Sequence, residues 1–158
     1  MNIRFLIPGK CRERYIQEGV SEYLKRISRF SKVSLIYLPE ESLLENAPSS
    51  EVTKALKAEA DRALKQIRQD EFLFLVDIHG KKLDTKDFAM KMKEATAKNG
   101  NLVFLFGSSY GLDDSLRRRA DFSFSLSDFT FTHYMALLLT VEQVYRSFKI
   151  NRGEAYDK

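Results

Sequence analysis

Two continuous apolar runs constrain the fold of this chain more than any other feature of its sequence. Residues 72–76 read Phe-Leu-Phe-Leu-Val, and residues 102–106 read Leu-Val-Phe-Leu-Phe. Neither run alternates apolar with polar side chains, as a strand with one solvated face does. Each run therefore predicts a strand that is buried on both faces, which is typical of a parallel sheet covered by helices.

Shorter β-rich runs and amphipathic segments alternate along the rest of the 158 residues. Further strands are predicted at residues 3–7, 33–38 and 122–126. Helices are predicted at residues 16–27, 51–68, 85–98, 113–119 and 133–150, with Ser49 or Ser50 capping the second helix and Asp84 or Thr85 capping the third. This alternation predicts a single α/β domain over residues 1–158, an open, largely parallel sheet with helices on both faces.

The composition excludes several classes of protein. Hydrophobic residues make up 44% of the chain and charged residues 30%, which is ordinary for a globular domain and too apolar for a disordered one. The single cysteine, Cys11, excludes an intrachain disulfide, and with only His79 and His133 as histidines we expect no metal site. No apolar run approaches the roughly 20 residues that span a bilayer, so we expect a cytoplasmic protein without a membrane partner.

The positive charge is concentrated near the N-terminus. Residues 1–36 hold eight lysines and arginines against three glutamates, whereas the remaining 122 residues hold 18 basic and 19 acidic side chains. A basic segment of this kind suits a polyanionic partner, but on charge alone it is more typical of a solvated helix face.

Three predicted strand ends are candidates for a ligand site, because ligands of open α/β sheets bind beyond the carboxyl ends of the strands. They lie at residues 77–80, 107–111 and 127–131. In the second, Gly107 and Gly111 flank two serines, which indicates either a tight turn or a loop that a ligand approaches closely. The loop lacks the Lys-Ser/Thr pair of a P-loop and the spacing of the dinucleotide-binding fingerprint.

The same loop and the C-terminal third of the chain carry a resemblance to a known family. The motifs are Gly107-Ser-Ser-x-Gly111, Leu-Ser-Asp-Phe-Thr-Phe-x-His at 126–133, Val-Glu-Gln-Val-Tyr-Arg at 141–146 and Asn-Arg-Gly-Glu-x-Tyr-x-Lys at 151–158. With Gly9-Lys10 and Ile78-x-Gly80-Lys81, they resemble the ribosomal RNA large subunit methyltransferase H family. These are S-adenosylmethionine-dependent enzymes of the SPOUT class, and the similarity covers essentially the whole chain.

The resemblance implies a fold, a reaction and a set of cofactor-binding residues. The fold would include a C-terminal trefoil knot, and the protein would be a homodimer. The reaction would be methylation of N3 of a pseudouridine in 23S ribosomal RNA, a step of rRNA processing with the assembled ribosome as substrate. By motif position, the residues that bind S-adenosyl-L-methionine would be Val76, Gly107, Leu126, Ser127, Asp128, Phe129, Thr130 and Phe131. For Phe129 and Phe131, plain core packing is the alternative.

Three further residues are candidates for the reaction itself. The N3 proton of pseudouridine must leave, and His133 follows the cofactor segment and opens the last helix. Arg152 is suited to contact a phosphate or a base edge, and Tyr156 to stack on a base. The alternatives are a structural histidine at a helix start and a frayed C-terminal tail.

The chain departs from the family pattern at several positions. Ser108 replaces Gly or Pro, Thr132 and Tyr134 replace Pro and Gln, Leu137 replaces Arg, and Asp157 replaces His. A second hypothesis is therefore a ribosome-binding protein that keeps the fold and the cofactor pocket but is catalytically weakened. A third, a nucleotide- or flavin-binding α/β module, is disfavoured because no phosphate fingerprint is present.

Overall fold

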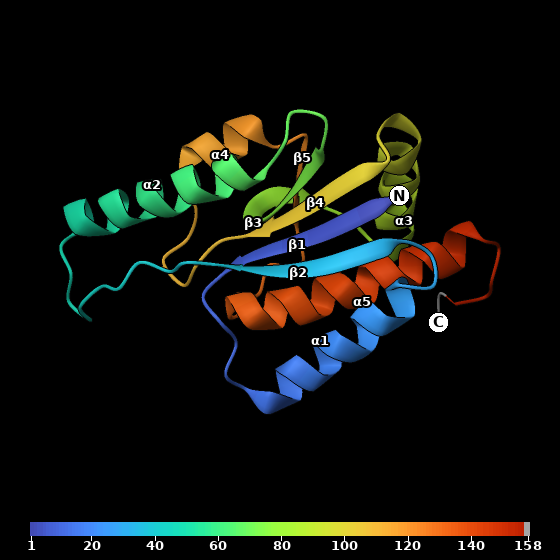
Figure 1. The fold of residues 1–158 in the computed structure, drawn as a ribbon, viewed down its shortest axis with the longest axis horizontal. Coiled ribbons are helices and arrows are strands. Elements are labelled where there is room, and N and C mark those ends of the chain that lie inside the picture. The colour runs from blue at the N-terminus through green and yellow to red at the C-terminus, as the bar shows by residue number, and fades with distance from the viewer. Residues whose placement is uncertain (157–158) are drawn as a thin grey trace.

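The computed structural model describes residues 1–156, so the predicted departure at Asp157 lies outside the described residues. Strands and helices alternate along this part of the chain, as the sequence predicts (Figure 1). In chain order the elements are β1 (Asn2–Pro8), α1 (Arg14–Ile27), β2 (Lys32–Leu38), α2 (Ser49–Gln66), β3 (Phe72–Lys82), α3 (Thr85–Lys98), β4 (Asn101–Phe106), α4 (Asp114–Arg119), β5 (Phe122–Ser125) and α5 (His133–Asn151).

The strands form one sheet in the order β2-β1-β4-β3-β5, and every neighbouring pair is parallel. The two apolar runs lie in β3 and β4, side by side within the sheet. Residues 72–75 and 102–106 are at most 7% exposed, which confirms the prediction of strands buried on both faces. Val76, at the carboxyl end of the buried part of β3, is partly exposed.

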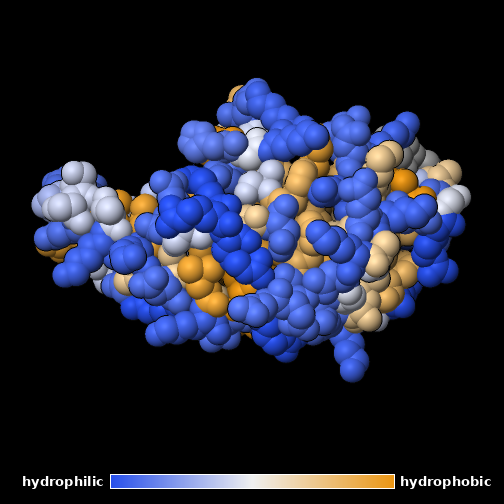
Figure 2. Space-filling model, turned by 90° about the horizontal axis from the view of Figure 1, so that it is seen from above, coloured by the Kyte–Doolittle hydropathy of each residue, from blue (hydrophilic) through white to orange (hydrophobic). Residues whose placement is uncertain are grey.

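Helices cover both faces of the sheet, because successive strand residues point to opposite sides (Figure 1). On the face of α1, α3 and α5, the ring of Phe104 stacks on Phe5 and Phe74, with centroids 5.1 and 4.7 Å apart. On the other face, Leu73 and Leu105 belong to a second core with residues of α2 and α4. Figure 2 views the molecule from the side of these two helices, and that surface is mostly hydrophilic.

The predicted helix starts are partly correct. Asp84 caps α3, where its carboxylate accepts a hydrogen bond of 2.8 Å from the backbone N–H of Asp87. The prediction that Ser49 or Ser50 caps α2 is wrong, because the helix already includes both residues and Pro48 occupies the cap position. The fixed φ of proline suits the entry to a helix without any side-chain hydrogen bond.

Strand β3 continues beyond its predicted end through an irregularity. Both Val76 and Lys81 pair with Phe124 of β5, so residues 77–80 leave the sheet and return to it. A Cβ atom at Gly80 would lie 2.6–2.7 Å from backbone atoms of Phe124, so only glycine allows this return. We call residues 77–80 the β3 excursion; they project beyond the carboxyl end of the buried part of the strand.

Candidate functional site

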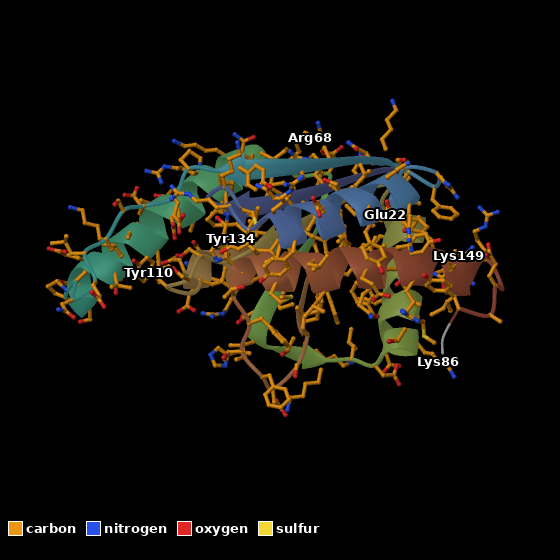
Figure 3. All side chains as sticks on the ribbon, turned by 90° about the horizontal axis from the view of Figure 1, so that it is seen from below. Glu22, Arg68, Lys86, Tyr110, Tyr134 and Lys149 are labelled. Carbon is orange, nitrogen blue, oxygen red and sulfur yellow. The ribbon has the colours of Figure 1, made fainter. Side chains whose placement is uncertain are left out.

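A hollow of about 1010 Å³ opens at the carboxyl ends of β3, β4 and β5. Its walls come from residues 76–79, 106–112, 125–127 and 129–134, with Glu13 and Arg117 adding side chains. Tyr110 and Tyr134, labelled in Figure 3, both line it. The three strand ends that the sequence singled out therefore meet in one place, since the carboxyl ends of parallel strands share one edge of a sheet.

Seven of the eight residues expected to bind the cofactor line this hollow. They are Val76, Gly107, Leu126, Ser127, Phe129, Thr130 and Phe131. The exception is Asp128, whose exposed carboxylate pairs with Lys82 Nζ at 2.5 Å. Gly107 and Ser127, which follow different strands and are 20 positions apart in the sequence, thus share one cavity.

The loop at residues 107–111 closes on itself. The backbone N–H of Gly111 donates to the carbonyl oxygen of Ser108 at 3.1 Å, and the Ser108 hydroxyl accepts from the N–H of Tyr110 at 3.3 Å. A Cβ atom on Gly107 would lie 2.6 Å from the carbonyl oxygen of Gly111. Gly107 is therefore required by the closure of the tight turn, and the turn presents its backbone to the hollow.

The segment at residues 125–132 carries two exposed aromatic side chains at the hollow. The hydroxyl of Ser125 donates to the carbonyl oxygen of Ser127 at 2.9 Å, and the hydroxyl of Ser127 accepts from the N–H of Phe129 at 3.1 Å. These bonds bend the chain after β5. Phe129 is 79% exposed and Phe131 is 42% exposed, so plain core packing, the alternative for these residues, does not describe them.

His133 begins α5 and forms part of the wall of the hollow. Its Nε2 lies 3.1 Å from the carbonyl oxygen of Pro8, so Nε2 carries the proton and donates it to this bond. Nδ1 is buried and has no hydrogen-bond partner among the described residues. Burial lowers the pKa of His133, and the opposing effects of Glu40 and the Pro8 carbonyl are smaller. The ring is therefore neutral at pH 7, with a lone pair on Nδ1.

Arg152 and Tyr156 lie away from the hollow of their own chain. They follow the far end of α5, a helix of 19 residues, and about 1.5 Å per residue separates the two ends by roughly 27 Å. Figure 3 shows this separation, with Tyr134 near one end of α5 and Lys149 near the other. The Arg152 guanidinium lies 5.1 Å from the centroid of the Phe30 ring, so this part of the tail packs on the domain.

Sequence reasoning missed an ion pair at the hollow, because its members are 40 positions apart. Arg117 Nε lies 2.6 Å from Asp77 Oδ2, and both residues line the hollow. Burial alone raises the pKa of Asp77, but hydrogen bonds from Arg117 and from the N–H of His79 hold that pKa below its usual value. The only signal in the sequence was an acidic residue directly after a buried strand.

The structure offers no arrangement for a metal and no membrane span in the part of the chain that it describes. Among residues 1–156, no three His, Cys, Asp or Glu side chains gather as a metal ion would require. No helix in this range combines the length and the apolar character needed to cross a bilayer.

Comparison with known proteins places the chain in a family. The family model described as "Predicted SPOUT methyltransferase" matches residues 1–157. The protein named "Ribosomal RNA large subunit methyltransferase H" of Acetivibrio thermocellus is 38% identical over the full length of both chains. The protein of that name from Desulforamulus reducens is 40% identical over all of this chain and 99% of its own.

A solved structure shares the fold. It is titled a probable methylase family protein from Haemophilus influenzae Rd KW20, and it matches with a TM-score of 0.55 at 14% sequence identity. The match covers 96% of this chain and 66% of that one. With the family model matched over nearly the whole sequence and relatives of equal length at 38–40% identity, the chain belongs to the SPOUT methyltransferase family, in the group named ribosomal RNA large subunit methyltransferase H.

Proposed function

We propose that this protein transfers a methyl group from S-adenosyl-L-methionine to N3 of a pseudouridine in 23S ribosomal RNA, with the assembled ribosome as substrate and the cytoplasm as its location. The observation that carries the proposal is the convergence of seven expected cofactor residues on one hollow. The printed names of the full-length relatives support ribosomal RNA as the substrate class.

The hollow suits S-adenosyl-L-methionine in size and chemistry. Its volume of about 1010 Å³ lies at the upper end of the range for small-molecule sites, roughly 300–1,000 Å³. Val76 and Leu126 offer apolar surface for an adenine, and the turn at 107–111 offers backbone groups for its polar edge. The bound cofactor supplies an electrophilic methyl group, and this chain must hold it in line with the acceptor nitrogen.

His133 is proposed to take the proton from N3. Its Nδ1 has a free lone pair because Nε2–H is engaged by Pro8, and burial keeps the ring neutral. The Pro8 bond also fixes the orientation of the ring, so that the proton moves to a defined atom. Because Nδ1 is buried, this step requires the side chains that cover it to move when RNA binds, so that the N3–H can donate to its lone pair.

The positions of Arg152 and Tyr156 support a homodimer in which the tail of one copy reaches the hollow of the other. Within one chain Arg152 lies roughly 27 Å from His133 along α5. Tyr156 packs back on Tyr145, with ring centroids 5.4 Å apart, and does not line the hollow. Both residues therefore contact the same RNA as His133 only if a second copy supplies them. We further propose that residues 1–158 act as one SPOUT-type domain with a C-terminal trefoil knot.

The weakened ribosome-binding protein remains the second candidate because of one observation. Leu137 is 1% exposed and belongs to the main core, one helical turn beyond His133. Where the family pattern expects an arginine, this chain therefore places a buried apolar side chain.

Two measurements test the proposal. Calorimetry should detect binding of S-adenosyl-L-methionine, and labelled cofactor should transfer tritium to ribosomes that lack the modification but not to modified ones. Absence of cofactor binding would overturn the proposal. Cofactor and ribosome binding without transfer would favour the second candidate.

Mixing two inactive variants tests the dimer. His133→Ala and Arg152→Ala should each be inactive, because each removes one half of both sites. In an equal mixture that exchanges subunits, about one quarter of the sites would be intact, and activity should return to about that fraction of wild type. A mixture that stays inactive despite subunit exchange contradicts a shared site.

A further inference from the structure

Asp77 and Arg117 link two of the segments that line the hollow. Asp77 is the first residue of the β3 excursion, and Arg117 lies in α4, which follows the turn at 107–111. Arg117 Nε lies 2.6 Å from Asp77 Oδ2, and Nη2 lies 3.4 Å from Oδ1. Arg117 Nη1 also donates to Asp114 Oδ1 at 2.7 Å, which holds the guanidinium on its own helix. The pair thus ties the excursion to α4, the helix that directly follows the turn.

Because Asp77 is buried, the position of its carboxylate depends on the hydrogen bonds that Arg117 donates to it. Asp77 is 5% exposed, and its low pKa keeps it charged. Its described donors are Arg117 and the N–H of His79, the latter 3.1 Å from Oδ1. A buried carboxylate that loses its cation must find water or another donor, and the segment around it moves to allow this. The hollow, which Asp77 lines, is the adjacent space into which its side chain would turn.

The excursion is also anchored at its other end. Its far end is held by the close approach of Gly80 to the backbone of Phe124. Between the two ends, Ile78 is 48% exposed and lines the hollow together with His79. The buried part of β3 is paired with β4 and β5 independently of the excursion. Loss of the ion pair should therefore displace the wall of the hollow and leave the sheet intact.

We infer that Asp77 and Arg117 are a positioning pair, which sets the spacing between the β3 excursion and the turn at 107–111 and thereby the affinity for S-adenosyl-L-methionine. The inference rests on the proposed function of the hollow. Neither residue is required to touch the cofactor, because both act through the backbone segments that they hold.

Arg119 provides a matched control in the same helix. Its guanidinium pairs with Asp121 at 3.1 Å and donates to the carbonyl oxygens of Arg68 and Glu71, each at 3.0 Å. It does not line the hollow. Arg119→Gln should therefore lower the melting temperature without changing cofactor affinity, so that general destabilisation is separated from positioning.

The experiment compares the dissociation constant for S-adenosyl-L-methionine with the melting temperature in the full chain. Arg117→Gln and Asp77→Asn should each weaken binding by about tenfold, since small displacements of a binding wall are costly. Arg117→Lys keeps the charge but not the two-nitrogen contact, and it should recover only part of the affinity. Far-UV circular dichroism below the melting transition verifies that each variant is folded.

The outcomes separate this inference from the proposed function. Affinities of Arg117→Gln and Asp77→Asn within twofold of wild type would overturn the positioning role and leave the cofactor site standing. An equal loss of affinity in Arg119→Gln would also overturn it, because the effect would then follow stability alone. A wild-type protein that does not bind the cofactor would refute the proposed function itself.

Discussion

Replacing Gly107 by alanine should have two effects: it should strain the turn at 107–111, and it should weaken cofactor binding. The new Cβ atom would lie 2.6 Å from the carbonyl oxygen of Gly111 and 2.9 Å from Leu112 Cγ. Contacts of a Cβ atom below 3.0 Å are essentially never seen in proteins, so the turn must open by at least a few tenths of an ångström. Leu112 can rotate away, but the Gly111 oxygen is backbone and moves only with the turn.

The size of the effect follows from this displacement. Overpacking of this kind costs about 1–3 kcal/mol, which lowers the melting temperature of a chain of this length by roughly 2–12 °C. If the free protein relieves the strain by opening the turn, cofactor binding must close the turn again, and the strain energy then opposes binding. Because 1.4 kcal/mol corresponds to a tenfold change, the dissociation constant for S-adenosyl-L-methionine should rise by about 5- to 140-fold. The substitution thus acts on the turn's own closure rather than by filling the hollow.

Calorimetry and thermal unfolding of Gly107→Ala check this expectation, with Gly100→Ala as the matched control. Gly100 has no atom within 4 Å of an added Cβ and no positive φ, so alanine there should change neither quantity appreciably. Cofactor affinity and melting temperature in Gly107→Ala that match those of Gly100→Ala would refute the argument that the glycine is needed for the turn.

Three further predictions concern stability and pH. Arg4→Met should cost about 1–3 kcal/mol in chemical denaturation, because the 2%-exposed Glu71 loses its 2.7 Å partner and keeps only Arg68. Arg14→Met, which breaks an exposed pair, should change stability little. Because burial lowers the pKa of His133 below its ordinary 6.5, its contribution to stability is full above pH 6.5 and falls as the pH drops toward the lowered pKa. The rate of methyl transfer should also fall as the pH drops through this lowered pKa. A denaturation midpoint of His133→Gln that depends on pH as strongly as that of the wild type would contradict this assignment. Gly80→Ala should destabilise the protein by about 1–3 kcal/mol, because its Cβ atom would lie 2.6 Å from the backbone of Phe124 in β5. Unchanged stability, together with a crystal structure of the variant in which β5 has not moved, would refute this reason.

Sequence reasoning predicted the elements of the fold well because their signals are local. The uninterrupted apolar runs at 72–76 and 102–106 indicated strands buried on both faces, and Asp84 indicated a helix start; the structure has both. In a parallel sheet the carboxyl ends of the strands share one edge, and ligands bind there. The convergence of Gly107 and Ser127 on one hollow could therefore be expected from the sequence. The motifs of the C-terminal third identified the family.

Only the tertiary structure decided how distant segments meet. Periodicity shows which faces of a strand are buried but not which strands are neighbours, so the order β2-β1-β4-β3-β5 was not predictable from it. The pairing of Asp77 with Arg117 joins residues 40 positions apart, and no local pattern specifies such a contact. The length of α5 separates Arg152 from His133 although both belong to one motif-rich region, because a helix extends steadily along its axis. Local side-chain chemistry thus determined the elements, and long-range packing determined which residues share a site.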